Sequence, residues 1–177
     1  APLLISLAQT REALYLVNRS GNAPSHLDSA FWIDRSLDLV AGRFEEVWLR
    51  GDTDFSLTEH LDRWDKRCKF VFGLDARQNL VSIAQRLSED QWGALERKPK
   101  YEVKTEERQR PENVKERIVR ERGFKNIRTV SEQVAEFDYR PGKCEKTYRV
   151  VVLRKNLTVE RGEEALFDDI RYFFYIT

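Results

Sequence analysis

Residues 46–56 read Glu-Val-Trp-Leu-Arg-Gly-Asp-Thr-Asp-Phe-Ser, an apolar run that ends in an acidic turn containing glycine. The run from Val47 to Leu49 predicts a buried strand, which stops at Gly51 and Asp52. Gly51 lets another backbone or a ligand approach closely at this point. Since sites in α/β sheets gather at the carboxyl ends of strands, Asp52 is the candidate chemical centre of the chain.

The same carboxylate has a simpler structural role open to it. Asp, Ser and Thr before an apolar-periodic segment are preferred N-cap residues, so Asp52 and Asp54 can cap the helix expected just after them. Ser56 and Thr58 can cap that helix without either aspartate. The local pattern therefore leaves both a chemical and a structural role for Asp52.

Strands and helices alternate on both sides of this stretch. The elements expected up to residue 87 are a hairpin (3–8 and 13–17), a helix from Ser25 to a stop at Gly42, the strand at 47–49, a helix (57–67), a strand (69–75) and a helix (79–87). This order predicts an α/β layer structure in which the strands at 47–49 and 70–74 are parallel neighbours.

The pattern changes near residue 88. A short helix is expected at 88–97, and β-structure at 101–105, 117–120, 130–139, 148–154 and 171–176, with a turn at 162–164. Residues 98–155 contain 17 Lys and Arg against 10 Asp and Glu, a net charge of +7, so the rest of the chain carries −6. This asymmetry favours a polyanion as partner of the basic segment, and the interspersed acids equally fit a solvated mixed-charge surface.

The bulk composition excludes several classes of protein. Hydrophobic residues make up 41% and charged residues 34% of the 177 residues, which indicates a folded chain rather than a disordered one. We find no signal-peptide pattern and no apolar run long enough to span a membrane. Cys68 and Cys144 form no Cys-x-x-Cys or zinc pattern, so we expect both to be reduced, to pack as small apolar residues and to indicate a cytoplasmic protein.

The order of several short motifs resembles the middle of an insertion-sequence DDE transposase. Residues 49–55, Leu-Arg-Gly-Asp-Thr-Asp-Phe, are similar to that family's second catalytic aspartate; Leu-Asp-Arg-Trp at 61–64 and Phe-Val-Phe-Gly-Leu-Asp at 70–75 are similar to the helix and strand that follow it. Segments 2–7, 18–22, 139–141, 147–149, 167–169 and 172–177 also resemble parts of the family pattern. The likeness covers nearly the whole chain and depends on the order and spacing of these motifs together.

The resemblance implies an α/β fold, a ribonuclease H-like mixed sheet flanked by helices, with a β-rich basic insertion. Residues 1–87 would form a partial core, residues 88–169 the insertion, and residues 170–177 a strand returning to the core. The polar termini usual for a complete domain are absent from both ends of the sequence, so we expect a fragment of a longer protein.

The resemblance also implies a reaction, DNA transposition by metal-dependent phosphodiester cleavage and strand transfer. In this family an Asp, a second Asp and a Glu bind two Mg²⁺ (or Mn²⁺) ions, and Mg²⁺ prefers such carboxylate oxygens. Asp52 corresponds to the second carboxylate, and Asp54 is the candidate for a supporting role at the metal. The family pattern places the other two carboxylates outside residues 1–177, and Glu163 and Glu164 lie in an expected turn and take no such role. We therefore expect the isolated chain to be inactive, and to bind a metal weakly or not at all.

DNA, as transposon ends and target, is the implied partner, and a homodimer remains open. Basic residues of the insertion are the candidates for contacting phosphates: Lys104, Arg108, Arg110, Lys115, Arg117 and Arg120. Each of them can instead be a solubilising surface charge. Trp92 and Tyr101 can stack on an unpaired base or pack in the core. Two alternatives to the enzyme stay open: a non-enzymatic DNA-binding or interaction module derived from a transposase, and an unrelated α/β protein in which Asp52 only caps a helix.

Overall fold

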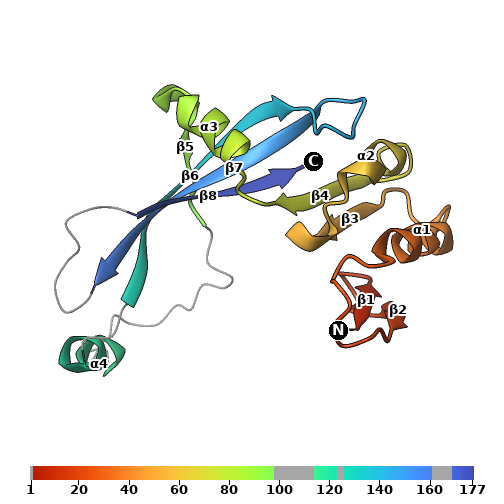
Figure 1. Ribbon diagram of the computed structural model, residues 1–177, viewed down its shortest axis with the longest axis horizontal. Coiled ribbons are helices and arrows are strands. Elements are labelled where there is room, and N and C mark those ends of the chain that lie inside the picture. Colours follow the sequence, from red (N-terminus) through yellow and green to blue (C-terminus); the bar gives the residue numbers. More distant parts are fainter. Residues whose placement is uncertain (1, 98–113, 123–125, 161–168) are drawn as a thin grey trace. The chain divides into compact units, whose positions relative to one another are not determined.

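The computed structural model describes residues 2–97, 114–122, 126–160 and 169–177 (Figure 1). The chain divides into two compact units. Unit 1 comprises Ala1–Ala76, Glu136–Val151 and Phe174–Thr177, and unit 2 comprises Arg77–Ala135 and Val152–Phe173.

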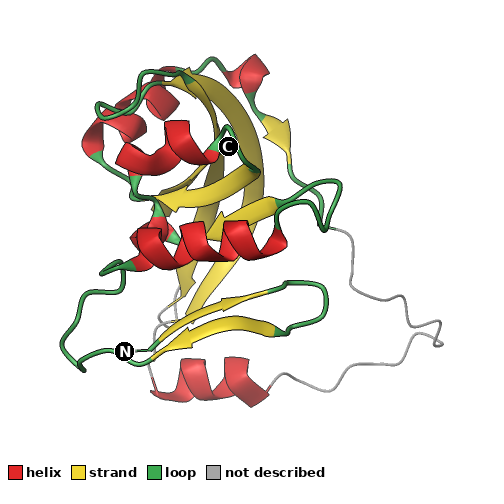
Figure 2. Cartoon of the chain, turned by 90° about the vertical axis from the view of Figure 1, so that its right-hand side faces the viewer, coloured by secondary structure: helices red, strands yellow, loops and turns green. Residues whose placement is uncertain are grey.

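Unit 1 begins with the predicted hairpin. Strands β1 (Leu3–Ser6) and β2 (Ala13–Val17) pair in antiparallel register, with Leu3 opposite Val17. Arg11 closes the connection with a positive φ of 63°. Helix α1 (Ser29–Val40) contacts both strands, and Figure 2 shows the hairpin running beside it near the N-terminus.

Helix α1 begins at Ser29 instead of Ser25. The reason is local, because the backbone N–H of Leu27 donates to the carbonyl of Pro24 at 3.1 Å and Asp28 adopts a left-handed φ of 55°, so these residues form a turn. The predicted stop is confirmed, since Gly42 has a φ of +69°. The apolar positions Ile33, Leu37 and Val40 are buried at helical spacing.

The central stretch forms strand β3 (Trp48–Gly51), the 3₁₀ turn η1 (Thr53–Phe55) and helix α2 (Thr58–Trp64), and strand β4 (Lys69–Leu74) follows. Strands β3 and β4 pair in parallel, with Leu49 opposite Phe70 and Gly51 opposite Phe72, as the sequence pattern predicted. Both strands therefore end at the same edge, where Asp52 follows β3.

An aromatic cluster forms the core of unit 1. The rings of Trp64 and Phe72 lie 5.6 Å apart, and Phe70 lies 5.8 Å from Phe72 and 5.4 Å from Tyr148. Trp64 and Phe72 are fully buried. The hydroxyl of Tyr148 donates to Asp62 at 2.6 Å, and this hydrogen bond holds the pKa of Asp62 below its ordinary value. Helix α2 is thereby fixed to the first residue of strand β7 (Tyr148–Glu160).

Among the described residues, six strands form a mixed sheet in the order β3-β4-β8-β7-β6-β5. The other strands of this sheet are β5 (Gly93–Ala94), β6 (Asn126–Tyr139), β7 (Tyr148–Glu160) and β8 (Asp169–Ile176). Strand β8 is antiparallel to β4, and β5 is antiparallel to β6. The chain is therefore a mixed α/β protein with helices flanking a mixed sheet.

The helices of unit 2 are α3 (Gln78–Arg86), the 3₁₀ turn η2 (Glu89–Gln91) and α4 (Val114–Arg122). Two expectations were wrong here. Residues 88–97 form only η2 and β5 rather than one helix, and residues 117–120 lie in α4 rather than in a strand. Four residues are too few to distinguish the period of a strand from that of a helix. In the structure, Arg117 and Glu121 form an i, i+4 ion pair at 3.8 Å, which is the spacing of neighbours on a helix. The expected strand at 101–105 and the turn at 162–164 lie outside the described residues.

Trp92 packs in the core of unit 2. Its side chain is 7% exposed, and the guanidinium of Arg154 lies 4.3 Å from its ring centroid. Glu89 holds that guanidinium with two hydrogen bonds, of 2.8 and 2.6 Å. Core packing is thus the role that the structure gives Trp92, while Tyr101 lies outside the described residues.

A half-buried carboxylate ties strand β6 to its surroundings in unit 2. Glu132 is 11% exposed and accepts hydrogen bonds from Arg97 at 3.2 Å and pairs with Lys155 at 2.8 Å. The hydrogen bonds from these two cations lower the pKa of Glu132 to about 2. Folding therefore favours the ionised form of Glu132.

Both cysteines are free and buried, as the composition suggested. The thiol of Cys144 lies 3.1 Å from the carbonyl oxygen of Thr58, and Cys68 lies 3.6 Å from that of Trp64. Burial raises the pKa of each thiol to about 11. Within the described parts of the chain, none of the helices has the length and apolar character needed to cross a membrane.

Candidate functional site

Asp52 lies directly after the carboxyl end of β3, and its side chain is exposed. Its Oδ1 accepts a hydrogen bond of 3.1 Å from the backbone N–H of Asp54, and its backbone carbonyl accepts one of 3.2 Å from Phe55. Asp52 is therefore the N-cap of η1. The sequence left open a cap of the helix expected at 57–67; the structure gives Asp52 the cap of the 3₁₀ turn before that helix instead.

Ser56 and Thr58, the alternative caps for the following helix, do not cap it in the structure. Helix α2 has Leu57 as its N-cap and no side-chain hydrogen bond there. The hydroxyl of Ser56 donates backwards to the carbonyl of Thr53 at 2.8 Å instead. The inserted 3₁₀ turn explains the difference, because it separates the end of β3 from the start of α2.

Two glycines allow the chain to turn at Asp52. A Cβ on Gly51 would lie 2.8 Å from Cε1 of Phe72, whose ring is fully buried. A Cβ on Gly73 would lie 3.0 Å from the methyl group of Thr53 and 3.1 Å from its backbone nitrogen. The last residue of β3 thus lies against the Phe72 side chain, and the backbone of Asp52 and Thr53 lies against β4 at Gly73; together these contacts fix the position of Asp52.

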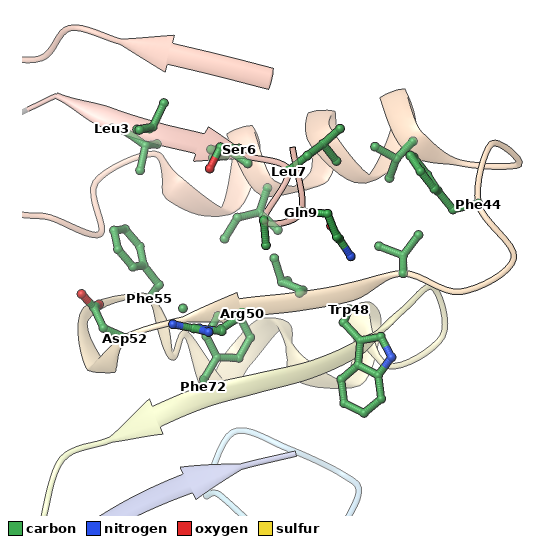
Figure 3. A pocket seen from close by; sticks show the side chains of 18 of the residues that line it. Leu3, Ser6, Leu7, Gln9, Phe44, Trp48, Arg50, Asp52, Phe55 and Phe72 are labelled. Carbon is green, nitrogen blue, oxygen red and sulfur yellow. The ribbon is translucent and has the colours of Figure 1, made fainter. Parts of the chain in front are cut away.

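A cavity of about 680 Å³ opens beside this point within unit 1 (Figure 3). It is lined by residues 3–9 of the hairpin, by Ile33 and Val40 of α1, by residues 46–52, and by Phe44, Phe55 and Phe72. In Figure 3, Asp52 and Phe55 lie at one end of the cavity and Phe44 and Trp48 at the other. Asp52 is therefore a rim residue of a mainly apolar cavity.

The cap uses one oxygen of Asp52 and leaves Oδ2 with no partner among the described residues. Mg²⁺ is commonly bound through one or two carboxylates and several waters, so Asp52 can offer one ligand. The side chain of Asp54, two residues on, is exposed. In the part of the chain that the structure describes, no place brings together three or more His, Cys, Asp or Glu side chains. These residues do not form a complete metal centre on their own.

The predicted DNA-contacting residues fall into two groups. Lys104, Arg108 and Arg110 lie outside the described residues. Lys115, Arg117 and Arg120 belong to helix α4 of unit 2, and Arg117 is exposed. Asp52 belongs to unit 1, so the two parts of the predicted site come from different units of the chain.

The hairpin residues and Arg50 were not among the site residues predicted from the sequence. Arg50 lines the cavity together with Ser6 and Gln9. The signal available for Arg50 was its polar side chain inside an otherwise apolar strand, two residues before Asp52. No comparable signal exists for Ser6 and Gln9, because only the tertiary placement of the hairpin brings them to the cavity.

Comparisons with protein-family models, with curated proteins and with solved structures gave no match to the chain.

Proposed function

We propose that the chain is the central part of a ribonuclease H-like DDE transposase domain, in which Asp52 is one of the metal-binding carboxylates. The observation that carries this proposal is the position of Asp52: an exposed carboxylate with one free oxygen, at the shared carboxyl edge of two parallel strands and at the rim of a cavity. A mixed sheet with flanking helices is compatible with such a domain.

In this proposal each residue near the turn has a defined task. Asp52 would hold a Mg²⁺ or Mn²⁺ ion with its free oxygen, while its capped oxygen keeps the side chain oriented. The exposed Asp54 would assist, directly or through water. When bound, the ions would supply the charge that stabilises attacking and leaving oxygens at a DNA phosphate. The remaining carboxylates would come from outside these 177 residues, so the isolated chain should not join DNA strands.

Metal binding tests the role of Asp52. We expect Mn²⁺ to broaden the NMR signals of residues around Asp52 in the unaltered chain, and Asp52→Asn to abolish the broadening. Asparagine keeps an N-cap oxygen, so Asp52→Asn should unfold at nearly the same urea concentration as the parent. Asp52→Ala removes the cap and should cost about 0.5–2 kcal/mol.

Asp90→Asn is the control, because Asp90 is an exposed aspartate within another 3₁₀ turn, η2. Its broadening should match that of the parent chain. If Mn²⁺ broadens the Asp52→Asn and parent spectra alike, Asp52 is a helix cap and no more. Magnesium-dependent joining of DNA strands by the isolated chain would also contradict the proposal.

A non-enzymatic module that binds DNA through unit 2 is the second candidate. Helix α4 favours it, because the helix carries Lys115, Arg117 and Arg120. Duplex binding without any metal effect at Asp52 would support this candidate over the first.

A further inference from the structure

The turn that joins β6 to β7, residues 140–147, gathers positive charge within unit 1. It carries three cations, Arg140, Lys143 and Lys146, against one acid, Glu145, and all four residues are exposed. Helix α2 belongs to the same unit and lies beside this turn (Figure 1). The turn therefore presents an excess of positive charge to solvent next to α2.

Helix α2 holds the backbone of this turn through Asp62. One carboxylate oxygen of Asp62 accepts the backbone N–H of Glu145 at 2.7 Å. The other accepts the backbone N–H of Lys146 at 3.4 Å and the hydroxyl of Tyr148 at 2.6 Å. Cys144, which precedes these donors, is buried. Asp62 thus fixes the turn without using any of its cationic side chains.

The two lysines of the turn are paired with other acids of α2 and its C-cap. The ammonium group of Lys143 lies 3.4 Å from Glu59, and that of Lys146 lies 2.5 Å from Asp65. Both pairs face solvent, since the side chains of Lys143 and Lys146 are 66% and 49% exposed. Exposed ion pairs are weak because water and salt screen them, so another anion can replace either acid.

Acidic and basic residues face different neighbours along this helical segment. Glu59, Asp62 and Asp65 follow one another at three-residue intervals, about 4.5 Å of helix rise each, and all three contact the turn. Arg63, by contrast, pairs with Asp34 of α1 at 2.6 Å. A row of carboxylates therefore lies along the basic turn, where a row of phosphates would meet the same two lysines.

We propose that the β6–β7 turn is a contact site for the phosphate backbone of duplex DNA, and that Glu59 and Asp65 compete with the DNA for Lys143 and Lys146. Asp62 keeps the turn in place while the two lysines exchange a carboxylate for a phosphate. Because the turn is already ordered, the exchange costs little conformational entropy. The competing acids therefore weaken DNA binding in the free chain without abolishing it.

This inference rests on the proposed function for the choice of duplex DNA as the polyanion, but it needs no metal. It also differs from the contacts predicted from the sequence, because none of those candidates lies in the turn. Lysine contacts to phosphates position DNA and carry no base information, so the turn should bind duplexes of different sequence alike.

Removing the competing acids tests the exchange. Glu59→Gln combined with Asp65→Asn frees both lysines, so we expect the affinity of the full chain for a short labelled duplex to rise about two- to tenfold. Fluorescence anisotropy at about 100 mM salt measures it. Each single substitution should give part of the gain, which keeps the test decisive if the double variant unfolds at a lower urea concentration than the parent.

The charge-matched control is Glu45→Gln combined with Asp28→Asn, because both are exposed acids of unit 1 outside α2. It changes the net charge equally and should gain clearly less affinity. Equal gains would mean that only net charge matters and would overturn the competition. Absence of duplex binding even after Glu59 and Asp65 are replaced would overturn the contact itself.

Replacing the lysines tests the contact directly. Lys143→Gln with Lys146→Gln should reduce the slope of log K against log salt by about 0.9 per lost phosphate contact. Added to the Glu59 and Asp65 substitutions, it should also cancel their gain. Arg35→Gln with Arg43→Gln is the control, because both are exposed cations of unit 1 outside the turn. An unchanged slope for the lysine variant, or equal changes in both variants, would overturn the proposal.

Two further measurements separate this contact from its alternatives. If a single strand of the same length gains as much as the duplex from the loss of Glu59 and Asp65, the turn accepts any nucleic-acid strand and duplex DNA is the wrong occupant. Mn²⁺ broadening around Asp52 is read on the same variants. Broadening that persists while the turn variants bind DNA like the parent rejects the turn contact alone; lost broadening with the expected DNA response rejects the metal site alone.

Discussion

At Asp52 the two oxygens of one carboxylate have different surroundings. Oδ1 is engaged by the backbone of Asp54, whereas no described residue engages Oδ2. A helix cap and a metal ligand are therefore compatible in one side chain. Packing fixes the position of Asp52. Because Gly51 and Gly73 have no side chain, Phe72 can lie close to Gly51 and Thr53 close to Gly73.

The first prediction concerns Gly51. Gly51→Ala places a methyl group 2.8 Å from the buried ring of Phe72 and 3.0 Å from Cβ of Phe55, so a side chain or the strand must move. We expect a loss of about 1–3 kcal/mol in the free energy of unfolding, measured with urea. Gly21→Ala is the control, because a Cβ there has no atom within 4 Å. Equal free energies of unfolding for the two variants would show that β3 accommodates the added methyl group without loss of stability.

At the level of elements, the sequence was most informative where the apolar period was long. The apolar runs in 69–75 and 148–154 and the spacing of Ile33, Leu37 and Val40 predicted β4, β7 and α1. The error at 117–120 arose because Ile118 and Val119 have high strand propensity, while the surrounding Lys, Glu and Arg residues favour a helix.

The second prediction concerns the contacts of strand β6 in unit 2. Glu132 has a pKa of about 2 in the fold, against an ordinary value of 4.5 that the unfolded chain should show. Above pH 4.5 the group is ionised in both states and its full contribution to stability is present. As the pH falls from 4.5 toward 2, the unfolded state takes up the proton first, so stability is lost.

Glu132→Gln should therefore be less stable than the parent at pH 7 and should lose less stability between pH 4.5 and 2. Urea unfolding at a series of pH values measures both. Glu136→Gln serves as the control, because Glu136 is exposed and lies 3.5 Å from Arg149 at the surface. If the parent and Glu132→Gln lose the same free energy of unfolding between pH 4.5 and 2, the low pKa of Glu132 is contradicted.

For the whole molecule, the sequence predicted the α/β class and the parallel pairing of β3 and β4, but not the cavity beside them. The cavity depends on the position of the hairpin relative to the sheet, which is a tertiary feature. The apolar pattern of residues 3–6 does not show whether β1 is paired on one edge or on both. Arg50 and Ser6 are distant in sequence, and no periodicity connects them. Asp52 could be found because a strand end is a local feature.

The third prediction concerns DNA. If the basic residues of α4 contact phosphates, binding of the full chain to a short duplex should weaken steeply between about 50 and 200 mM salt. Replacing Lys115, Arg117 and Arg120 together by Gln should reduce the slope of log K against log salt by about 0.9 per lost contact. Fluorescence anisotropy of a labelled duplex measures this slope.

A charge-matched control replaces Arg43, Lys66 and Arg86 by Gln. All three are exposed, and none belongs to α4. If both triple variants change the slope equally, the effect is one of net charge and α4 has no special part in binding. If neither variant binds less than the parent, the basic segment is a solubilising surface.

The two buried thiols have a practical consequence for future work. Thiolates react with maleimides and iodoacetamides, and a pKa of about 11 leaves Cys68 and Cys144 almost wholly protonated at neutral pH. A cysteine introduced on the surface should therefore take a spin label or dye while the native ones stay unmodified. Distances between such labels can then report how the two compact units are arranged in solution, without first removing either natural sulfur.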